Sequence, residues 1–236
     1  YAGQVPQNSH LNAVIDESPD TCTSLLVDRY LNGQYSLWAI TAAFGDNLIH
    51  IAEQHCGIAH LNSNDIQKLR QLGELVNYNG YGTKIDDLHF HPAELYQALK
   101  PFQDPREAYD HAPEIAILAT GYAEDMEHTR TMTAEAATAT TAVYRLPDTA
   151  WARRAVGVWA NELSQNFPAR AHLIICPDGE NSYTISVRAA KSHPNGASAF
   201  CRRYPGGGGR EAAAGINKLP DSNLAELIQT FELAFK

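Results

Sequence analysis

Residues 201–217 read Cys-Arg-Arg-Tyr-Pro-Gly-Gly-Gly-Gly-Arg-Glu-Ala-Ala-Ala-Gly-Ile-Asn, and this stretch decides how the rest of the chain is interpreted. Glycine lacks a Cβ and adopts positive φ without steric cost, so consecutive glycines can turn their backbone N–H groups into a concave anion nest. Arg210 follows directly, where its guanidinium can hold bound oxygens. The sequence therefore predicts a phosphate-binding segment that consists of Gly206, Gly207, Gly208, Gly209 and Arg210.

A flexible linker is the alternative interpretation of the glycine run. Both flanks of the run carry apolar patterning, which favours a built site over a linker, but the local composition leaves both open. The run matches neither of two common phosphate signatures. The G-x-G-x-x-G spacing fails, and the run continues as Gly209-Arg210-Glu211, where a P-loop has Gly-Lys-Ser/Thr.

Composition and net charge limit the kinds of ligand that the chain can bind. The 236 residues are 44% hydrophobic, which is enough for a sizeable core, and the formal net charge is −9. An acidic chain disfavours a long nucleic-acid track, because each contacted phosphate requires a Lys or Arg. Residues 186–210 depart from this balance, with five basic residues and no Asp or Glu. A local anion site fits that distribution.

The location of the protein is predicted from its cysteines and its apolar runs. The four cysteines are scattered without a C-x-x-C pair, so we expect reduced thiols in a cytoplasmic protein. The apolar runs, such as residues 171–176, are too short to span a bilayer. We therefore expect no membrane partner.

Residues 1–135 are predicted to be mostly helical. Helical patterns cover residues 21–31, 36–60, 65–76, 92–99 and 114–132, and the apolar run at 11–15 is consistent with the end of a buried strand. Asp46 and His50 are four residues apart, and such a pair on one helical face is half of a site for a Mn²⁺-like ion. The alternative is that Asp46 caps a helix that restarts after Gly45.

Residues 136–236 are predicted to form a mixed α and β unit. Residues 131–142 indicate a helical connector, followed by a strand at 142–146 and a core-facing helix at 151–167. A hairpin follows, with strands at 171–176 and 183–188 around a Pro-Asp-Gly turn, so Arg188 lies at a strand end. A short helix then precedes the glycine run, and a helix at 221–235 ends the chain.

These motifs together resemble the DHH phosphoesterase superfamily. The combination of Ser186-Val187-Arg188, the glycine run, Arg210 and Ala213-Ala214-Gly215 resembles its DHH-associated domain. Residues 15–24 and 42–47 look like the second half of its catalytic domain. The resemblance implies a fold of the α/β and α+β class, in which a mostly helical remainder of the DHH catalytic domain is followed by a smaller mixed-sheet DHH-associated domain. The predicted division is 1–135 and 136–236.

The resemblance also implies a reaction. In that superfamily two divalent metals, Mn²⁺ or Mg²⁺, activate a hydroxide that attacks a phosphate ester, and Asp46 matches the aspartate of the fourth metal-binding motif. The first motif and the Asp-His-His triplet are absent from the 236 residues, so we expect an inactive fragment of a larger hydrolase that holds no catalytic residue itself. Arg210 stands where the superfamily more usually has His.

The predicted function is therefore part of a metal-dependent phosphoesterase that acts on small nucleotides or short oligonucleotides. Arg188, the glycine run and Arg210 are predicted to bind the phosphate, and Asp46 to bind metal. Two alternatives stay open. One is a non-catalytic nucleotide- or RNA-binding module, and the other is a single-strand exonuclease of the RecJ type, which the acidic balance disfavours.

Overall fold

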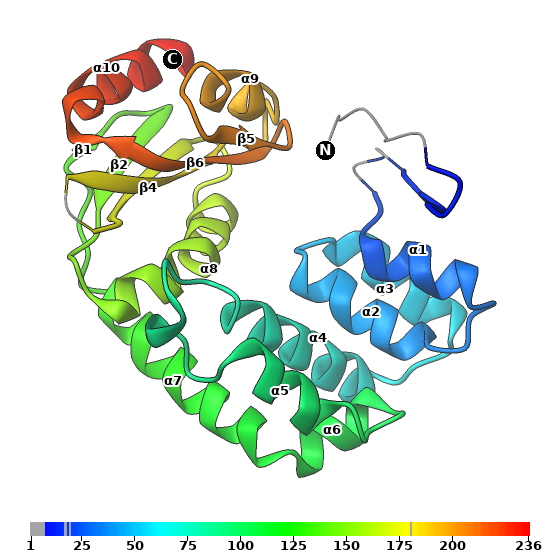
Figure 1. Cartoon of the computed structure of the whole chain (residues 1–236). Coiled ribbons are helices and arrows are strands. Elements are labelled where there is room, and N and C mark those ends of the chain that lie inside the picture. Colours follow the sequence, from blue (N-terminus) through cyan, green and yellow to red (C-terminus); the bar gives the residue numbers. More distant parts are fainter. Residues whose placement is uncertain (1–7, 17, 19, 180) are drawn as a thin grey trace. The chain divides into compact units, whose positions relative to one another are not determined.

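The computed structural model of the chain describes residues 8–16, 18, 20–179 and 181–236, and it divides into two compact units (Figure 1). The first comprises Tyr1–Asn77 and His91–Ala119, and the second comprises Tyr78–Phe90 and Thr120–Lys236. The described part of the first unit is helical, whereas the second contains a six-stranded mixed sheet. The predicted fold class, a mostly helical part followed by a mixed-sheet part, is confirmed.

The helices of the first unit follow one another with short connections. They are α1 (Thr23–Tyr30), α2 (Ser36–Gly45), α3 (Ile49–Ile58), α4 (Ser63–Tyr78), α5 (Pro92–Leu99), α6 (Pro105–His111) and α7 (Pro113–Thr129), of which α4 and α7 continue into the second unit. Two of these helices begin where the sequence supplies both a cap and a proline. Asp104 accepts a hydrogen bond from the Arg106 N–H before Pro105, and His91 accepts one from Ala93 before Pro92, as expected for helix N-termini.

Two glycines bring helices α2 and α4 into backbone contact. A Cβ on Gly45 would lie 2.7 Å from the carbonyl oxygen of Gly73, and one on Gly73 would lie 2.0 Å from that of Thr41. The first unit builds its core beside this contact, from buried side chains that include Leu25, Ile40, Phe44 and Leu69. Gly45 therefore serves helix packing as well as ending α2.

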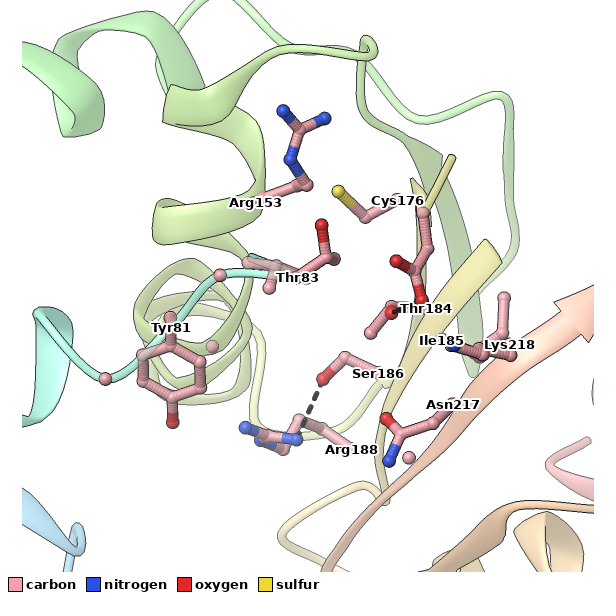
Figure 2. Close-up of a pocket in the computed structure, with 16 residues that line it drawn as sticks. Tyr81, Thr83, Arg153, Cys176, Thr184, Ile185, Ser186, Arg188, Asn217 and Lys218 are labelled. Atoms are coloured by element: carbon pink, nitrogen blue, oxygen red, sulfur yellow. Dashed lines mark hydrogen bonds between the residues drawn. The ribbon is translucent and has the colours of Figure 1, made fainter. Parts of the chain in front are cut away.

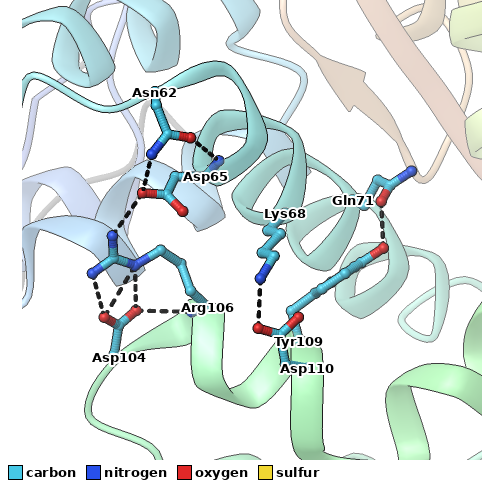
Figure 3. A network of polar contacts seen from close by, with 8 residues as sticks. All are labelled: Asn62, Asp65, Lys68, Gln71, Asp104, Arg106, Tyr109 and Asp110. Carbon is cyan, nitrogen blue, oxygen red and sulfur yellow. Dashed lines mark hydrogen bonds and ion pairs between the residues drawn. The ribbon is translucent and has the colours of Figure 1, made fainter.

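Helices α4 and α6 are joined by polar contacts that Figure 3 shows. Arg106 donates to both oxygens of Asp104 and, at 2.8 Å, to Asp65 of α4. One and two turns further along α4, Lys68 pairs with Asp110 and Gln71 accepts from Tyr109. These partly exposed contacts fix α6 on α4 within the first unit.

The sheet of the second unit has the strand order β1-β2-β3-β4-β6-β5. Strands β2 and β3 are parallel and joined by a helical crossover, while the other pairs are antiparallel. The elements are β1 (Ala136–Ala137), β2 (Thr141–Arg145), α8 (Ala150–Asn166), β3 (Ala171–Pro177), β4 (Ser182–Arg188), α9 (Ala197–Cys201), β5 (Gly207–Gly209), β6 (Ala213–Pro220) and α10 (Leu224–Ala234). Two 3₁₀ turns, η1 (Ile85–Asp87) and η2 (Asp221–Asn223), complete the chain.

Each face of the sheet has its own apolar cluster. Leu173, Ile185 and Ile216 point to the face that α9 and α10 cover, where Phe200 and Phe231 pack on them. Alternate residues point to the opposite face, where α8 covers Tyr144, Ile174 and Cys176. This alternation follows from the two-residue period of a strand.

Two sequence predictions about local structure are wrong. Residues 11–15 form no strand, and the side chains of Leu11, Val14 and Ile15 are about half exposed, because they have no neighbouring strand among the described residues. Residues 131–142 are not a helical connector. They contain β1 and the start of β2, which pair with each other, as suits the β-branched threonines of this segment.

The two compact units also differ from the predicted division at residue 135. Residues 78–90 and 120–135 belong to the sheet unit, because Tyr81, Tyr122, Met126 and Met132 pack into the cluster beneath α8. The assignment of residues 1–135 and 136–236 to a catalytic and a substrate-binding domain stays a prediction.

Candidate functional site

A pocket of about 560 Å³ lies within the second unit (Figure 2). Its walls come from the loop at residues 80–83, helix α8 and strands β3, β4 and β6. Charged lining residues are Arg153, Arg188, Lys218 and Asp178, and the polar ones are Thr83, Thr184, Ser186 and Asn217. The size is in the usual range for a small-molecule site.

The floor of the pocket is a polar stretch of the sheet face that α8 covers elsewhere. Register places Thr184 opposite Cys176, and Ser186 opposite Ile174, so all four side chains share one face. Ile174 and Cys176 are buried beneath α8, whereas Thr184 and Ser186 on the next strand are only partly buried. Hydroxyl groups replace apolar groups where the helix cover ends.

A β-bulge on β6 shapes one end of this floor. Leu219 pairs with Tyr183 and Ile216 with Ile185, so Asn217 and Lys218 together oppose Thr184. Lys218 has a positive φ of 55°, which is uncommon for a side chain of this size. Bulges of this kind re-aim side chains, and both Asn217 and Lys218 line the pocket.

Arg188 lies at the other end of the floor and is fixed by neutral groups only. Its Nε donates to Asn161 Oδ1 of α8 at 3.0 Å, and Nη1 donates to Ser186 Oγ at 3.0 Å and to the Val187 carbonyl at 3.2 Å. No described carboxylate forms an ion pair with it, and Nη2 has no acceptor among the described residues. Burial lowers the pKa of Arg188, which indicates an unfavourable environment for its uncompensated charge.

The strand beside Arg188 carries a buried imidazole. His172 lies opposite Arg188 in the β3–β4 register and is fully buried, and neither of its ring nitrogens has a hydrogen-bond partner among the described residues. Burial, together with the charges of Arg170 and Arg188, lowers the pKa of His172 to about 4. The imidazole is therefore neutral at pH 7, and the positive charge beside it comes from Arg170 and Arg188.

The loop over the pocket is held by two adjacent arginines of α8. Arg153 donates to both oxygens of Asp87 at 2.9 and 2.8 Å. Arg154 donates to the Asp87 carbonyl oxygen at 2.7 Å and to both side-chain oxygens of Asp125 on α7 at 2.8 and 2.9 Å. Burial raises the pKa of Asp87, but hydrogen bonds from Arg153 and Thr83 outweigh that effect and bring it to about 2. These arginines are neutralised and bind the loop, so the positive charge available to a ligand comes from Arg188 and Lys218.

Cys176 is the thiol in the pocket lining, and it is chemically inert. Burial raises the pKa of Cys176 to about 12, and the protonated thiol is a poor nucleophile. All four cysteines of the chain are buried and none is in a disulfide. The pocket therefore does not support thiol chemistry at neutral pH.

The glycine run is an edge strand, and the expected anion nest is not its conformation. Gly207, Gly208 and Gly209 pair with Ile216, Gly215 and Ala214 of β6. A Cβ on Gly207 would lie 1.8 Å from the Cys201 carbonyl oxygen, and one on Gly206 would lie 2.6 Å from that of Asn217. Close backbone approach thus accounts for most of the run, while a Cβ on Gly208 would meet nothing within 4 Å. A flexible linker would neither pair with a strand nor pack this closely, so the linker interpretation is wrong.

Of the predicted phosphate-binding residues, the pocket lining includes Arg188 but not the glycine run or Arg210. Arg210 is exposed and begins the turn from β5 to β6, where its backbone pairs with that of Ala213. Gly215, directly paired with Gly208, does line the pocket. The run therefore borders the lining strand.

Asp46 and His50 do not share a helical face. Asp46 is the C-cap of α2 and His50 lies in α3, with Asn47 at a φ of 60° between them. The capping alternative for a helix restart is also wrong, because Leu48 is the N-cap of α3. Asp46 is exposed, His50 contacts Gln54, and the described residues contain no group of three or more His, Cys, Asp or Glu that could hold a metal.

The sequence interpretation missed Tyr81, Thr184, Asn217 and Lys218. Alternation in β4 was a usable signal, since Ser182, Thr184, Ser186 and Arg188 are polar at every second position beside Ile185 and Val187. The bulge that turns Asn217 and Lys218 to the pocket has no comparable local signal. Tyr81 joins the pocket through a contact with helix α8.

Comparison with known proteins adds no argument about function. No protein-family model matches the chain, and no curated protein matches it. A solved structure of a pGpG-specific phosphodiesterase, PggH from Vibrio cholerae, is similar with a TM-score of 0.48 and 12% identity over 88% of this chain and 71% of that one. At this level of similarity the functional conclusions rest on the pocket alone. Among the described residues, no helix is both long and apolar enough to cross a bilayer.

Proposed function

We propose that the pocket of the second unit binds the phosphate group of a nucleotide or short oligonucleotide, with Arg188 as its anchor. The observation that carries the proposal is Arg188 itself, which is oriented by Asn161 and Ser186 and lacks a carboxylate partner among the described residues. A phosphate would compensate its charge through charge-assisted hydrogen bonds. Ser186 adds a hydroxyl donor on the floor, because its oxygen accepts from Arg188 and its proton stays available. The Thr184 hydroxyl instead donates to Asp178.

The glycine run and Arg210 form the outer part of the proposed phosphate-binding surface. Gly206, Gly207, Gly208 and Gly209 form the sheet edge and the turn that leads into it. An edge strand carries backbone N–H groups that no strand partner uses, although the Gly207 N–H donates to the Tyr204 carbonyl. A substitution of Gly208 tests binding without disturbing packing, because a Cβ at this position would meet no atom within 4 Å. Gly208→Val should weaken phosphate binding without lowering the melting temperature. Unchanged binding would remove the glycine run from the site.

The proposed reaction is phosphoester hydrolysis with Mn²⁺ or Mg²⁺, and Asp46 is the proposed metal ligand. The described residues do not fit such a metal centre by themselves, because Asp46 has no cluster of further ligands around it, whereas Mg²⁺ takes six oxygen ligands. We therefore derive no hydrolytic step. The measurement is Mn²⁺-dependent release of nucleotide from a dinucleotide by the larger hydrolase of which the chain is proposed to be a part, with Asp46→Asn as the variant. The 236 residues alone are expected to release no nucleotide. Activity that survives in Asp46→Asn would exclude this role.

The test of the binding proposal is calorimetric titration of the 236-residue chain with a nucleoside monophosphate. Charge-assisted hydrogen bonds contribute about 1.5–3 kcal/mol each, so Arg188→Ala should weaken binding roughly tenfold to a hundredfold. Arg130→Ala is the matched control, since Arg130 is an exposed arginine paired with Glu127 outside the pocket. Equal affinity of wild type and Arg188→Ala would overturn the proposal.

A non-catalytic binding module would show the same Arg188 dependence with no hydrolysis at any metal concentration. A single-strand exonuclease would instead prefer long substrates over dinucleotides. The dinucleotide assay and the titration together distinguish the three functions.

A further inference from the structure

Tyr81 forms a wall of the pocket on the side of helix α8. Figure 2 shows it there, across from Ser186 and Arg188 on β4. The helix makes room for the ring by omitting a side chain at Gly157, where a Cβ would lie 2.1 Å from ring carbons of Tyr81 and 2.6 Å from its hydroxyl oxygen. The ring is partly buried against the apolar cluster of α8. Because α8 backs part of the ring, its remaining surface is available to the pocket.

The loop that carries Tyr81 is fixed on both sides. Before it, Tyr78 is fully buried, and Asn79 exchanges two 3.0 Å hydrogen bonds with the backbone of Phe90. After it, the Thr83 N–H and hydroxyl both donate to Asp87, which Arg153 holds on α8. Side chains locked in this way lose little conformational entropy on binding. The aromatic wall is therefore pre-organised, although it lies in a loop.

We propose that Tyr81 is the stacking surface for the nucleobase of a nucleotide whose phosphate Arg188 binds. This inference rests on the proposed function. It adds recognition of the nucleobase, which Arg188 does not contact when it binds the phosphate. Arg188 and the Ser186 hydroxyl serve any phosphorylated compound, whereas an aromatic wall favours a ligand with a flat ring. Base–aromatic stacking is tolerant of base identity, so the site selects nucleotides over sugar phosphates with little preference among bases.

The test compares ligands that share a phosphate and differ in the base. AMP, GMP and ribose 5-phosphate are titrated calorimetrically into the full 236-residue chain. The tighter nucleotide should bind wild type about fivefold to a hundredfold better than ribose 5-phosphate, as stacking of one base predicts. Tyr81→Leu, which keeps an apolar side chain on α8 without an aromatic face, should lose that preference. Its affinity for ribose 5-phosphate should stay within about twofold, and Tyr81→Phe should keep the preference.

Gly157→Ala provides a second variant that leaves Tyr81 in the sequence. The added methyl group occupies the place of the ring, so the ring must move and the nucleotide preference should fall. Gly57→Ala is the matched control, because Gly57 also lies in a helix and its Cβ would meet no atom within 4 Å. Melting temperatures of all variants verify that they are folded.

The outcomes separate this inference from the proposed function. Preference for nucleotides that persists in Tyr81→Leu, with weaker binding in Arg188→Ala, would overturn the role of Tyr81 and leave the phosphate site intact. Equal binding of nucleotide and ribose 5-phosphate by wild type would overturn it as well. No binding of any phosphorylated ligand by wild type would overturn both proposals.

Discussion

Three arginines of the second unit lie close to the pocket, and two of them differ from the third in their partners. Arg153 and Arg154 each hold a buried carboxylate with two hydrogen bonds, whereas Arg188 contacts only an amide, a hydroxyl and a carbonyl. A buried charge without a counter-charge is costly. The comparison indicates that the α8 arginines stabilise the unit, whereas Arg188 carries a charge that no described carboxylate compensates.

The largest effect should come from breaking the α8 anchor. Arg154→Ala leaves Asp125, whose side chain is 5% exposed, buried without its counter-charge, and breaking such a pair costs about 3–5 kcal/mol. Arg188→Ala removes no ion pair and should change stability by less than about 1 kcal/mol. Urea denaturation of both variants measures the difference. Arg130→Ala, with its side chain 72% exposed, is the control and should lie within about 0.5 kcal/mol of wild type. Equal losses for Arg154→Ala and Arg188→Ala would break the comparison.

The second prediction concerns acid stability near Arg188. The folded-state pKa of His172 is about 4 against an ordinary value of 6.5, so between these values the unfolded chain binds a proton that the folded chain does not. Stability is therefore intact above pH 6.5 and falls as the pH is lowered toward 4, by up to about 3 kcal/mol. The pKa of His89 is also lowered, chiefly by burial, and adds to the loss.

Chemical denaturation at intervals from pH 7 to pH 4 measures this loss, and His172→Leu is the informative variant. Leucine keeps an apolar group among Tyr144 and Phe167, which flank the imidazole, and cannot be protonated. The variant should lose less stability than wild type over the same interval. Parallel curves for the two proteins would show that His172 contributes nothing to the acid sensitivity.

The sequence predicted most of the helices, although not α6, and it predicted the hairpin, because these signals are local. Pro92 with His91 marks the start of α5, and Pro177-Asp178-Gly179 marks the turn between β3 and β4. The position of Arg188 at the end of a strand was also predicted, from the alternation of the preceding residues. The glycine run was predicted to form an anion nest and not a strand, because glycine carries no strand preference. Its extended conformation depends instead on pairing with β6 and on the carbonyl groups of Cys201 and Asn217.

The rest of the candidate site depends on contacts between distant residues. Gly157 and Tyr81 are far apart in sequence, and no motif links them. Glycine is unfavourable inside a helix, so Gly157 indicates a close packing contact, but the sequence does not show that Tyr81 makes it. The bulge at Asn217 and Lys218 results from the register between β4 and β6. Such features are set by tertiary packing, which sequence periodicity does not encode.

The third prediction compares Gly207, which packs closely against backbone, with Gly208, which has open space around it. Gly207→Ala places a methyl group against the Cys201 carbonyl and should destabilise the protein by about 1–3 kcal/mol, as overpacking does. Gly208→Ala should change stability by less than about 0.5 kcal/mol. Thermal denaturation measures both. A destabilised Gly208→Ala together with an unaffected Gly207→Ala would contradict the packing described for the edge strand.

The smallest effect is the salt dependence of binding. It tests whether the positive charge that contacts the ligand is confined to the pocket. A ligand held by Arg188, with Lys218 as the other cation in the lining that has no ion pair among the described residues, engages one or two phosphates. The logarithm of affinity plotted against that of salt concentration should then have a slope of magnitude about 1–2. A ten-nucleotide single strand should give nearly the same slope as a mononucleotide, because the net charge of −9 provides no continuous basic track. Arg188→Ala should lower the magnitude by about 1, whereas Arg130→Ala should leave it unchanged. A slope that steepens with strand length would place further cations on the ligand path, and Arg188 would then belong to an extended nucleic-acid surface.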